Sequence, residues 1–460
     1  MRTRRDILTT MGSGFGMLGL ATQAAQAAEQ AKSAMSVRAP HFPAKATNVI
    51  YLFLNGGPSQ VDTFDPKPML TKYHGQKAPT PNLKTERKTG TLLKSPFQFN
   101  RYGQSGLEIS EIFSNLGKHA DDLCVIRSMH TERPNHEPSL TMLNCGHVLV
   151  GHPSMGAWLT YGLGTVNQNL PGFVVLCAGY PVIGPQLWSS AYLPGIYQGT
   201  YVRNKSDDPE ELIRDVRNRS LTSDQQRQQV ELLTKLNRMQ LAREGADPSL
   251  EASIASFEMA YRMQAEAMDA FDVRKESVKT RESYGEGDFA RGCLLARRLV
   301  ERGVRMVQVY YGDDQPWDNH DDITKHARLA STADKPMAAL LQDLKDRDLL
   351  KSTIVIIGGE FGRTPAVEVS GLVDVQNGRD HNNHGFSTVV AGGGFKGGYA
   401  HGATDDFGFR AVEKPVHPHD LHGTILHQLG LDHTKLTYRY SGRDFRLTDV
   451  AGSVVRDLIA

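Results

Sequence analysis

Short apolar runs that end at glycine or polar residues recur along the chain and predict buried strands. The first run covers residues 48–54 and ends at the segment Asn55-Gly56-Gly57-Pro58. An apolar run of this length without polar alternation is typical of a strand that is buried on both faces. Five further runs have the same character, and they cover residues 123–126, 173–176, 304–310, 353–357 and 387–391.

Amphipathic patterns with helical spacing lie between these runs. Leucines at 340, 341 and 344 continue a stripe that begins at Pro336-Met337, and residues 289–300 and 420–429 behave in the same way. Strands that alternate with helices predict an α/β fold with a mostly parallel central sheet sandwiched by helices. In such sheets ligands collect at the carboxyl ends of the strands.

One stretch departs from this alternation. Residues from about 207 to 282 are rich in Gln, Glu, Arg, Met and Ala, and they are interrupted at positions 245–248. We expect a helical insertion within a single α/β domain that covers residues 46–460. Its Met and Leu stripe is more typical of packing against the main domain than of a cofactor site.

The N-terminus predicts an export signal. Arg4-Arg5 precedes a glycine-rich apolar stretch, and Ala25-Gln26-Ala27 offers the small residues of a cleavage site. We interpret residues 1–27 as a twin-arginine signal peptide and residues 28–45 as a flexible leader. The expected partner is the twin-arginine export machinery and the expected location is periplasmic or secreted. No run approaches the ~20 apolar residues of a stable membrane span.

Composition excludes several classes of function. Lys and Arg total 52 against 51 for Asp and Glu, so a nucleic-acid-binding surface is not expected. Four cysteines are widely spaced without a Cys-x-x-Cys pair, which argues against a thiolate zinc site. Export would permit disulfides, and the sequence leaves their pairing open.

Three polar segments, at residues 317–320, 358–365 and 378–384, carry the candidate chemistry. Asp318 and His320 stand two positions apart after a predicted strand, so both can reach one ion from a loop. A surface turn that caps the next helix is the alternative interpretation. Glu360 follows the strand at 353–357, where a buried carboxylate must be paired or metal-bound, and an ion pair with Arg363 is the structural alternative.

The third segment combines Arg379, Asp380, His381 and His384 in a predicted loop. A carboxylate beside an imidazole is a common arrangement around metals, because the acid fixes the tautomer of the ring. The arginines at 363 and 379 are candidates for neutralising an anionic substrate. A later group of histidines precedes or enters a helix and is interpreted as structural; its members are His417, His419, His422 and His427.

These motifs resemble the domain-of-unknown-function family numbered 1501. The resemblance rests on residues 56–68, on Asp-x-His at 318–320, on residues 358–365, on Gly-Arg-Asp-His at 378–381 and on the Gly-rich stretch at 391–398. That family is similar to the alkaline phosphatase and sulfatase superfamily, whose members bind divalent ions at the ends of a parallel sheet and hydrolyse phosphate or sulfate esters. The resemblance covers nearly the whole mature chain.

The resemblance implies a ligand set with departures from the superfamily pattern. Asp318, His320, Glu360 and His381 match metal ligands, and Asn55 stands where a carboxylate ligand is usual. His136 stands where the nucleophile is usual, and Phe361 replaces a histidine ligand. Fewer anionic ligands weaken a second ion site, so one metal with His136 as extra ligand, acid/base or nucleophile is expected.

The resulting hypothesis is an exported, metal-dependent hydrolase of sulfate or phosphate esters. The expected cofactor is a divalent ion, with Zn, Ca, Mg and Mn left open. The expected partner is a small anionic ester or a sulfated polysaccharide, which follows from the resemblance alone. The alternative is a catalytically silent relative that keeps the fold and serves as a binding or assembly protein.

Overall fold

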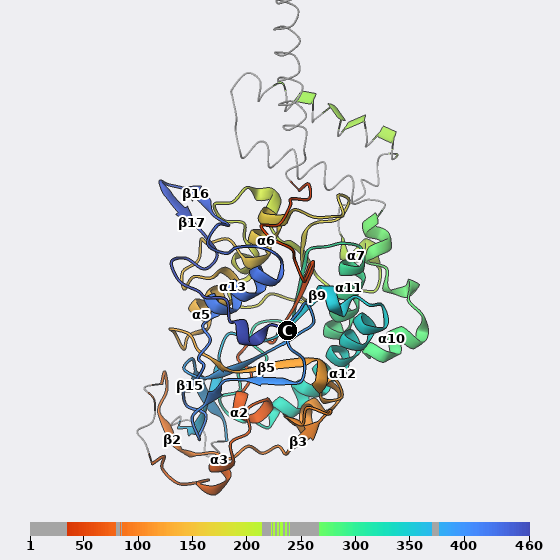
Figure 1. Ribbon diagram of the computed structural model, residues 1–460. Helices are drawn as coiled ribbons and strands as arrows, with labels where there is room; N and C mark the ends of the chain where they lie inside the picture. Colours follow the sequence, from red (N-terminus) through yellow and green to blue (C-terminus); the bar gives the residue numbers. More distant parts are fainter. Residues whose placement is uncertain are drawn as a thin grey trace, which may run out of the picture.

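A computed structural model describes residues 35–79, 83, 85–213, scattered positions between 222 and 239, 266–369 and 377–460 (Figure 1). The predicted signal peptide, residues 28–34 of the leader and most of the predicted insertion lie outside the described residues. Positions 266–282, at the end of that insertion, contain no strand. Among the described helices, none has both the length and the apolar character that crossing a membrane requires.

The centre of the fold is an eight-stranded sheet. In spatial order its strands are β13 (Tyr399–His401), β5 (Leu123–Met129), β12 (Phe386–Ala391), β9 (Thr353–Gly358), β1 (Asn48–Phe53), β8 (Met306–Tyr310), β6 (Phe173–Leu176) and β7 (Thr200–Val202). All six predicted strands are present and almost wholly buried, which confirms that their apolar runs lie between two covered faces.

Only β12 runs against the other strands of this sheet. It pairs antiparallel with both β5 and β9, while every other pair in the sheet is parallel. The predicted mostly parallel sheet is therefore confirmed. The reversal also has a consequence for position, because the beginning of β12 lies at the same edge as the carboxyl ends of its neighbours.

Helices cover both faces of the sheet, and side-chain contacts show which face each one takes. An added Cβ at Gly292 of α11 (Asp288–Glu301) would meet Val309, whereas one at Gly156 of α6 (Met155–Leu163) would meet Phe173. Phe173 is paired in register with Met306, so their side chains lie on the same face of the sheet. Met306 and Val309 are three positions apart on β8, so their side chains point to opposite faces. The two helices therefore lie on opposite faces.

Figure 1 shows the same division of the larger helices. α11 lies with α10 (Val278–Tyr284) and α12 (Lys325–Asp346) on one side of the central strands, and α6 lies with α5 (His136–Cys145) and α13 (Pro418–Gln428) on the other. Within the described ranges there are four shorter α-helices, and they are α2 (Gln60–Thr63), α3 (Pro68–Lys72), α4 (Ser114–Gly117) and α7 (Pro209–Leu212).

The helix α12 begins earlier than the apolar stripe predicts. The pattern suggests a start at Pro336, but the helix starts at Lys325 and carries this proline in its interior. Ala330, Ala333 and Asp334 extend the buried face toward the N-terminus. Asp334 is held there because its carboxylate accepts the backbone N–H groups of Asn115 and Leu116 at 2.8 and 2.7 Å, a partnership that local periodicity does not reveal.

A second, antiparallel sheet of three strands stands beside the first. Its order is β11 (Arg379–Asn382), β10 (Gly362–Glu368) and β2 (Thr89–Leu92). Residues 379–382 of the segment at 378–384 thus form a strand and not part of the predicted loop. Three hairpins complete the described strands, and they pair β3 (Phe99–Tyr102) with β4 (Leu107–Ser110), β14 (Ala403–Thr404) with β15 (Ala411–Glu413), and β16 (Tyr438–Tyr440) with β17 (Arg443–Phe445).

The described part of the predicted flexible leader is bound to the domain. The backbone N–H groups of His41 and Lys45 donate to the carbonyls of Gly430 and Gln428 at 2.8 Å each, and Met35 is buried. Residues 35–45 therefore extend the domain, because their backbone finds partners on the C-terminal part of the chain. All four cysteines are buried and unpaired.

The histidines around α13 support the fold, as predicted. His417 accepts the N–H of His419 as the N-terminal cap of α13, and Asp420 completes a capping box. The rings of His419 and His422 donate to the carbonyls of Gly146 and Leu143 at 2.7 and 2.9 Å. These carbonyls lie at the C-terminal end of α5, where the helix itself offers no donors.

We predict that His422 makes the fold sensitive to acid. Burial lowers the pKa of His422 to about 3, whereas an unfolded chain binds this proton near the ordinary value of 6.5. Because the unfolded state binds more protons in this window, stability falls as pH drops from about 6.5 toward 3. In His422→Gln the melting temperature should depend less steeply on pH there, whereas the exposed His74→Gln should keep the full slope. Equal slopes in the two variants would contradict this assignment.

Candidate metal centre

The loops after β1 and β8 meet at the carboxyl edge of the sheet through glycine. Gly56 has φ of 115°, and a Cβ there would lie 2.6 Å from the backbone nitrogen of Asp318. A side chain is therefore excluded on both conformational and steric grounds. This close approach places the loop that carries Asp318 directly over the end of the central strand β1.

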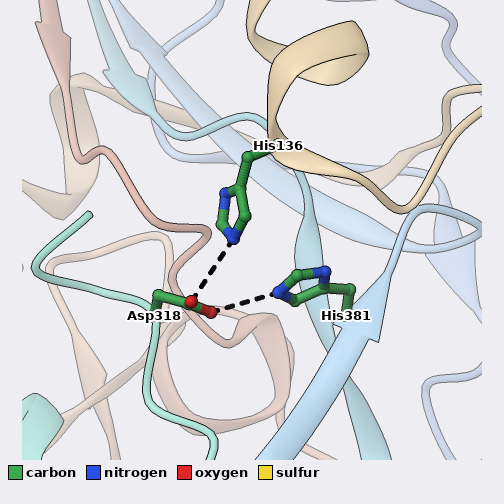
Figure 2. A group of neighbouring side chains, drawn as sticks. All are labelled: His136, Asp318 and His381. Atoms are coloured by element: carbon green, nitrogen blue, oxygen red, sulfur yellow. Dashed lines mark hydrogen bonds and ion pairs between the residues drawn. The ribbon is translucent and has the colours of Figure 1, made fainter. Parts of the chain in front are cut away.

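Asp318 is the common neighbour of three imidazoles. Its Oδ1 lies 2.9 Å from Nε2 of His320 and 3.1 Å from Nε2 of His381, and these two nitrogens are 3.0 Å apart. Its Oδ2 lies 3.4 Å from Nε2 of His136. Figure 2 shows His136, at the start of α5, and His381, on β11, both pointing at the Asp318 carboxylate. Elements far apart in the sequence thus converge on one point.

Each of the three imidazoles has a different glutamate near its other nitrogen. Nδ1 of His136 forms a hydrogen bond with Glu360 at 2.7 Å, whereas Nδ1 of His381 lies 3.2 Å from Glu86 without forming one. Nδ1 of His320 forms a short hydrogen bond with Glu368. A carboxylate behind an imidazole fixes the ring and directs its opposite nitrogen forward. The three Nε2 atoms are therefore oriented by the protein toward Asp318.

The pKa values at this centre are set by two opposing effects, burial of the charged groups and the interactions between them. Burial alone would raise the pKa of Asp318, but hydrogen bonds with the three histidines hold it well below its usual range. Burial disfavours the charged form of His136, yet its bonds with Asp318 and Glu360 raise its pKa to about 9. For His381 burial prevails and lowers the pKa to about 3. Neighbouring imidazoles are thus held in different protonation states.

Glu360 occupies a supporting position and not the predicted ligand position. Both of its oxygens accept the N–H of Gly56, at 2.9 and 3.1 Å, and Oε1 also pairs with His136. The alternative of an ion pair with Arg363 is not observed either. Arg363 instead contacts Oδ1 of Asp318 at 2.6 Å. Glu360 is directed away from Asp318 because the tight turn at Gly56 presents a donor to it.

Arg379 does not face the centre, which corrects its predicted role toward substrate. Its Nε and Nη2 donate to the two oxygens of Asp62 at 2.7 and 3.1 Å. The remaining bonds go to the carbonyls of Thr364 and Leu93, and Arg379 and Asp62 are both fully buried. These bonds to Asp62 and to two backbone carbonyls hold the side chain inside the protein.

Asn55 and Asp380 were both predicted as ligands, and each uses part of its side chain in bonds to the backbone, while Oδ1 of Asn55 is buried without a hydrogen-bond partner. Nδ2 of Asn55 donates to the carbonyls of Gly312 and Asp314 at 3.3 and 2.5 Å, so this residue fixes the loop after β8. Asp380 accepts the N–H groups of His381 and Arg87 at 2.8 and 2.7 Å. Its carboxylate still lies close enough to His320 and His381 to share an ion with them.

Two residues of the centre were not found by sequence reasoning. Glu368 lies on β10, and Glu86 lies just before β2 in a segment of mixed charge without a recognisable motif. The pairing of β10 with both β11 and β2 brings them behind the imidazoles. The available signal was Glu368 within the otherwise apolar run at 365–369, because a buried carboxylate in such a strand requires a partner.

Comparison with known proteins identifies the family of this chain. A family model described as "Protein of unknown function (DUF1501)" matches residues 46–459. The chain belongs to this family. The resemblance drawn from its motifs is thereby confirmed. No curated protein matches the chain.

Solved structures with related folds give distant similarities to this DUF1501 protein. It is similar to Ps i-CgsB at 11% identity and a TM-score of 0.38, covering 84% of this chain and 72% of that one. It is similar to the lipoteichoic acid synthase LtaP from Listeria monocytogenes at 11% identity and a TM-score of 0.34, covering 90% and 78%. It is similar to the alkaline phosphatase from the Antarctic bacterium TAB5 at 11% identity and a TM-score of 0.33, covering 85% of this chain and 99% of that one.

We predict that the Arg379–Asp62 pair is required for stability. Arg379→Met leaves a buried carboxylate without its partner, which costs about 3–5 kcal/mol. Urea unfolding followed by fluorescence should show a correspondingly lower midpoint. Arg101→Met is the control, because Arg101 is 79% exposed and its nearest carboxylate is 3.8 Å away, so a change within about 0.5 kcal/mol is expected. Equal midpoints for both variants would contradict the structural role.

Proposed function

We propose that this DUF1501 protein is a metal-dependent hydrolase of sulfate or phosphate esters. The observation that carries the proposal is the arrangement at Asp318, where three imidazole Nε2 atoms face one carboxylate and the rings of His136 and His320 are hydrogen-bonded from behind to glutamates. The ester class follows from the resemblance of the family to the alkaline phosphatase and sulfatase superfamily.

The size of the cluster fits a single ion. Two imidazole nitrogens and one carboxylate oxygen, from His320, His381 and Asp318, form a triangle with edges of 2.9, 3.0 and 3.1 Å. Bonds of about 2.0–2.1 Å to a tetrahedral zinc ion separate its ligand atoms by about 3.3 Å. The three atoms are thus close to the spacing of one coordination sphere, and His136 stands beside it as a further donor.

The charge balance also favours a cation. The centre gathers five carboxylates, from Glu86, Asp318, Glu360, Glu368 and Asp380. Two of them are paired with a guanidinium group: Asp318 with Arg363, and Glu368 with Arg87. Four of these residues are buried or largely shielded, and buried carboxylates require compensation. A divalent ion would supply it. Imidazole ligands favour Zn²⁺ over Mg²⁺, Ca²⁺ and Mn²⁺, which prefer oxygen ligands.

The roles of the protein groups follow from their positions. Such an ion, when bound, would polarise an oxygen of the ester. Nε2 of His136 lies 3.4 Å from Oδ2 of Asp318 and its Nδ1 is held by Glu360, so we assign to it the transfer of a proton during ester cleavage. Arg363 orients Asp318 through its bond to Oδ1, since its own bonds leave it no access to substrate.

Export by the twin-arginine route is part of the same proposal. The supporting sequence, Arg4-Arg5 before a short apolar stretch, lies outside the described residues. Four buried, unpaired thiols fit a chain that folds in a reducing compartment before export. A metal bound in that compartment would then be carried across with the folded protein.

We predict that metal binding and ester turnover depend on Asp318 and His381. Asp318→Asn and His381→Ala remove donors from the proposed coordination sphere, so metal content and turnover of aryl sulfates or aryl phosphates should each fall by more than about 100-fold. Elemental analysis and a chromogenic ester panel would measure the two effects. His384→Ala is the matched control, since His384 belongs to neither group of potential ligands and should leave both quantities unchanged.

The outcomes of this experiment separate the candidate functions. Metal that binds through these residues without turnover of any ester would favour the catalytically silent binding protein. Wild-type protein that binds no divalent ion would contradict the metal centre itself. Circular dichroism of each variant shows whether a loss reflects the site or the fold.

We predict that export fails when the arginine pair is replaced. In Arg4→Lys/Arg5→Lys the signal should no longer be recognised, so the precursor should accumulate in the cytoplasm with residues 1–27 attached. Cell fractionation and mass spectrometry of the N-terminus would measure this. Normal processing of the double variant would indicate a different route.

A further inference from the structure

A buried imidazole outside the centre bonds to two of the loops that form it. His326 lies in the first turn of α12 and is fully buried. Its Nε2 accepts the backbone N–H of Ser59 at 3.1 Å, and its Nδ1 bonds to Oδ1 of Asn319 at 2.9 Å. Ser59 ends the loop that follows β1. Asn319 stands between Asp318 and His320, in the loop after β8.

These two partners fix the tautomer of His326. A backbone N–H only donates, so Nε2 accepts from Ser59 with its lone pair and the ring proton lies on Nδ1. Nδ1–H therefore donates to Oδ1 of Asn319, which also fixes the orientation of this amide. Burial lowers the pKa of His326 to about 3, so the ring is neutral near pH 7 and both bonds are kept.

The loop after β8, which carries two of the proposed ligands, is long and contains no helix or strand. It extends from residue 311 to residue 324. The side chain of Asn319 has two described bonds, one to His326 and a longer one, at 3.4 Å, to the carbonyl of Pro316 in the same loop. The bond to His326 therefore ties this part of the loop to the 22-residue helix α12.

The helix α12 is a rigid base for this contact. It packs against α11, and its Asp334 carboxylate accepts two backbone N–H groups of the segment at 115–116. The first turn of the helix also brings the ring of His326 edge-to-face against Trp317, with the ring centroids 5.0 Å apart. Trp317 directly precedes Asp318. Contacts on both sides of Asp318, at residues 317 and 319, thus come from one buried side chain.

We propose that His326 is a positioning residue of the metal centre, which holds Asn319 and thereby fixes the spacing of Asp318 and His320. This inference rests on the proposed function and deepens it. Because adjacent residues share planar peptide units, anchoring residue 319 restricts the backbone on both of its sides. A metal ion requires its ligand atoms at defined separations, so freedom in this loop would lower the affinity for the ion.

The rigid ring of an imidazole suits this task, because it carries a donor and an acceptor on opposite sides. The acceptor side fixes Ser59, which lies in the same loop as Gly56. The N–H of Gly56 donates to Glu360, which in turn holds His136. The same ring therefore supports the loops behind two different donors of the centre.

A purely structural role of this imidazole makes a different prediction. His326→Phe would then lower the stability and leave the metal affinity of the folded protein unchanged. His422→Phe is the matched control, because His422 is a similarly buried imidazole that bonds to the carbonyl of Leu143, outside the centre. This control should lower the melting temperature without a change in metal affinity.

The experiment uses the full-length protein, depleted of metal and then titrated with Zn²⁺ in competition with a chromogenic chelator. We expect His326→Phe and Asn319→Ala each to weaken Zn²⁺ binding by about tenfold or more, because the support behind a ligand is lost. The double variant should lose no more affinity than either single variant, because both changes remove the same link. His326→Gln, which can keep one of the two bonds, should have an intermediate affinity.

Cobalt substitution provides the second measurement. The visible absorption of bound Co²⁺ depends on its coordination geometry. The spectrum should therefore change in His326→Phe and stay the same in His422→Phe, which a loss of stability alone would not produce.

Three results would overturn the inference: unchanged Zn²⁺ affinity in His326→Phe or in Asn319→Ala, fully additive losses in the double variant, and absence of Zn²⁺ binding by the wild type. The last of these would contradict the metal centre as well. Weaker Zn²⁺ binding by these variants of a protein that cleaves no ester would uphold the inference while contradicting the hydrolase. Asn319→Ala acts from the loop side, so it decides the question if His326→Phe does not fold.

Discussion

The contact on which the centre depends is that of the Asp318 carboxylate with its four cationic or polar neighbours. Arg363 holds Oδ1 from the protein side, and three imidazoles approach from the other directions. Removing the carboxylate would leave a buried guanidinium group and converging rings without compensation, which is costly in a medium of low dielectric constant. The surrounding loops are therefore organised around one negative charge.

The reversed direction of β12 explains how distant segments reach this charge. Residues before β12 arrive at the edge where β1, β8 and β9 end, because β12 runs against its neighbours. The strand β11 can then pair with β10, which starts from the end of β9. The small antiparallel sheet is thus a continuation of the central sheet's edge, and it brings His381 to the loop that carries Asp318.

Three arginines lie around the centre, and they differ in how deeply they are buried. Arg363 and Arg379 are enclosed and fully bonded, so they order the loops and the second sheet. The side chain of Arg87 is half exposed and pairs with the buried carboxylate of Glu368 at 3.0 Å. The same guanidinium chemistry thus supports the centre both from inside the protein and from its surface.

The sequence alone determined six of the eight strands of the central sheet, the helices α11, α12 and α13, and the segments that carry the chemistry. Uninterrupted apolar runs specify buried strands locally, and the pairs at 318–320 and 380–381 needed only residue type and spacing to be recognised. It also separated the structural histidines of α13 from the candidate ligands, because capping positions are local features. Tertiary structure decided the remaining roles. Glu360 supports the ring of His136, Arg379 pairs with Asp62, and Glu86 and Glu368 lie next to the rings of His381 and His320. Each of these roles depends on a partner that lies far away in the chain, which local sequence patterns do not reveal.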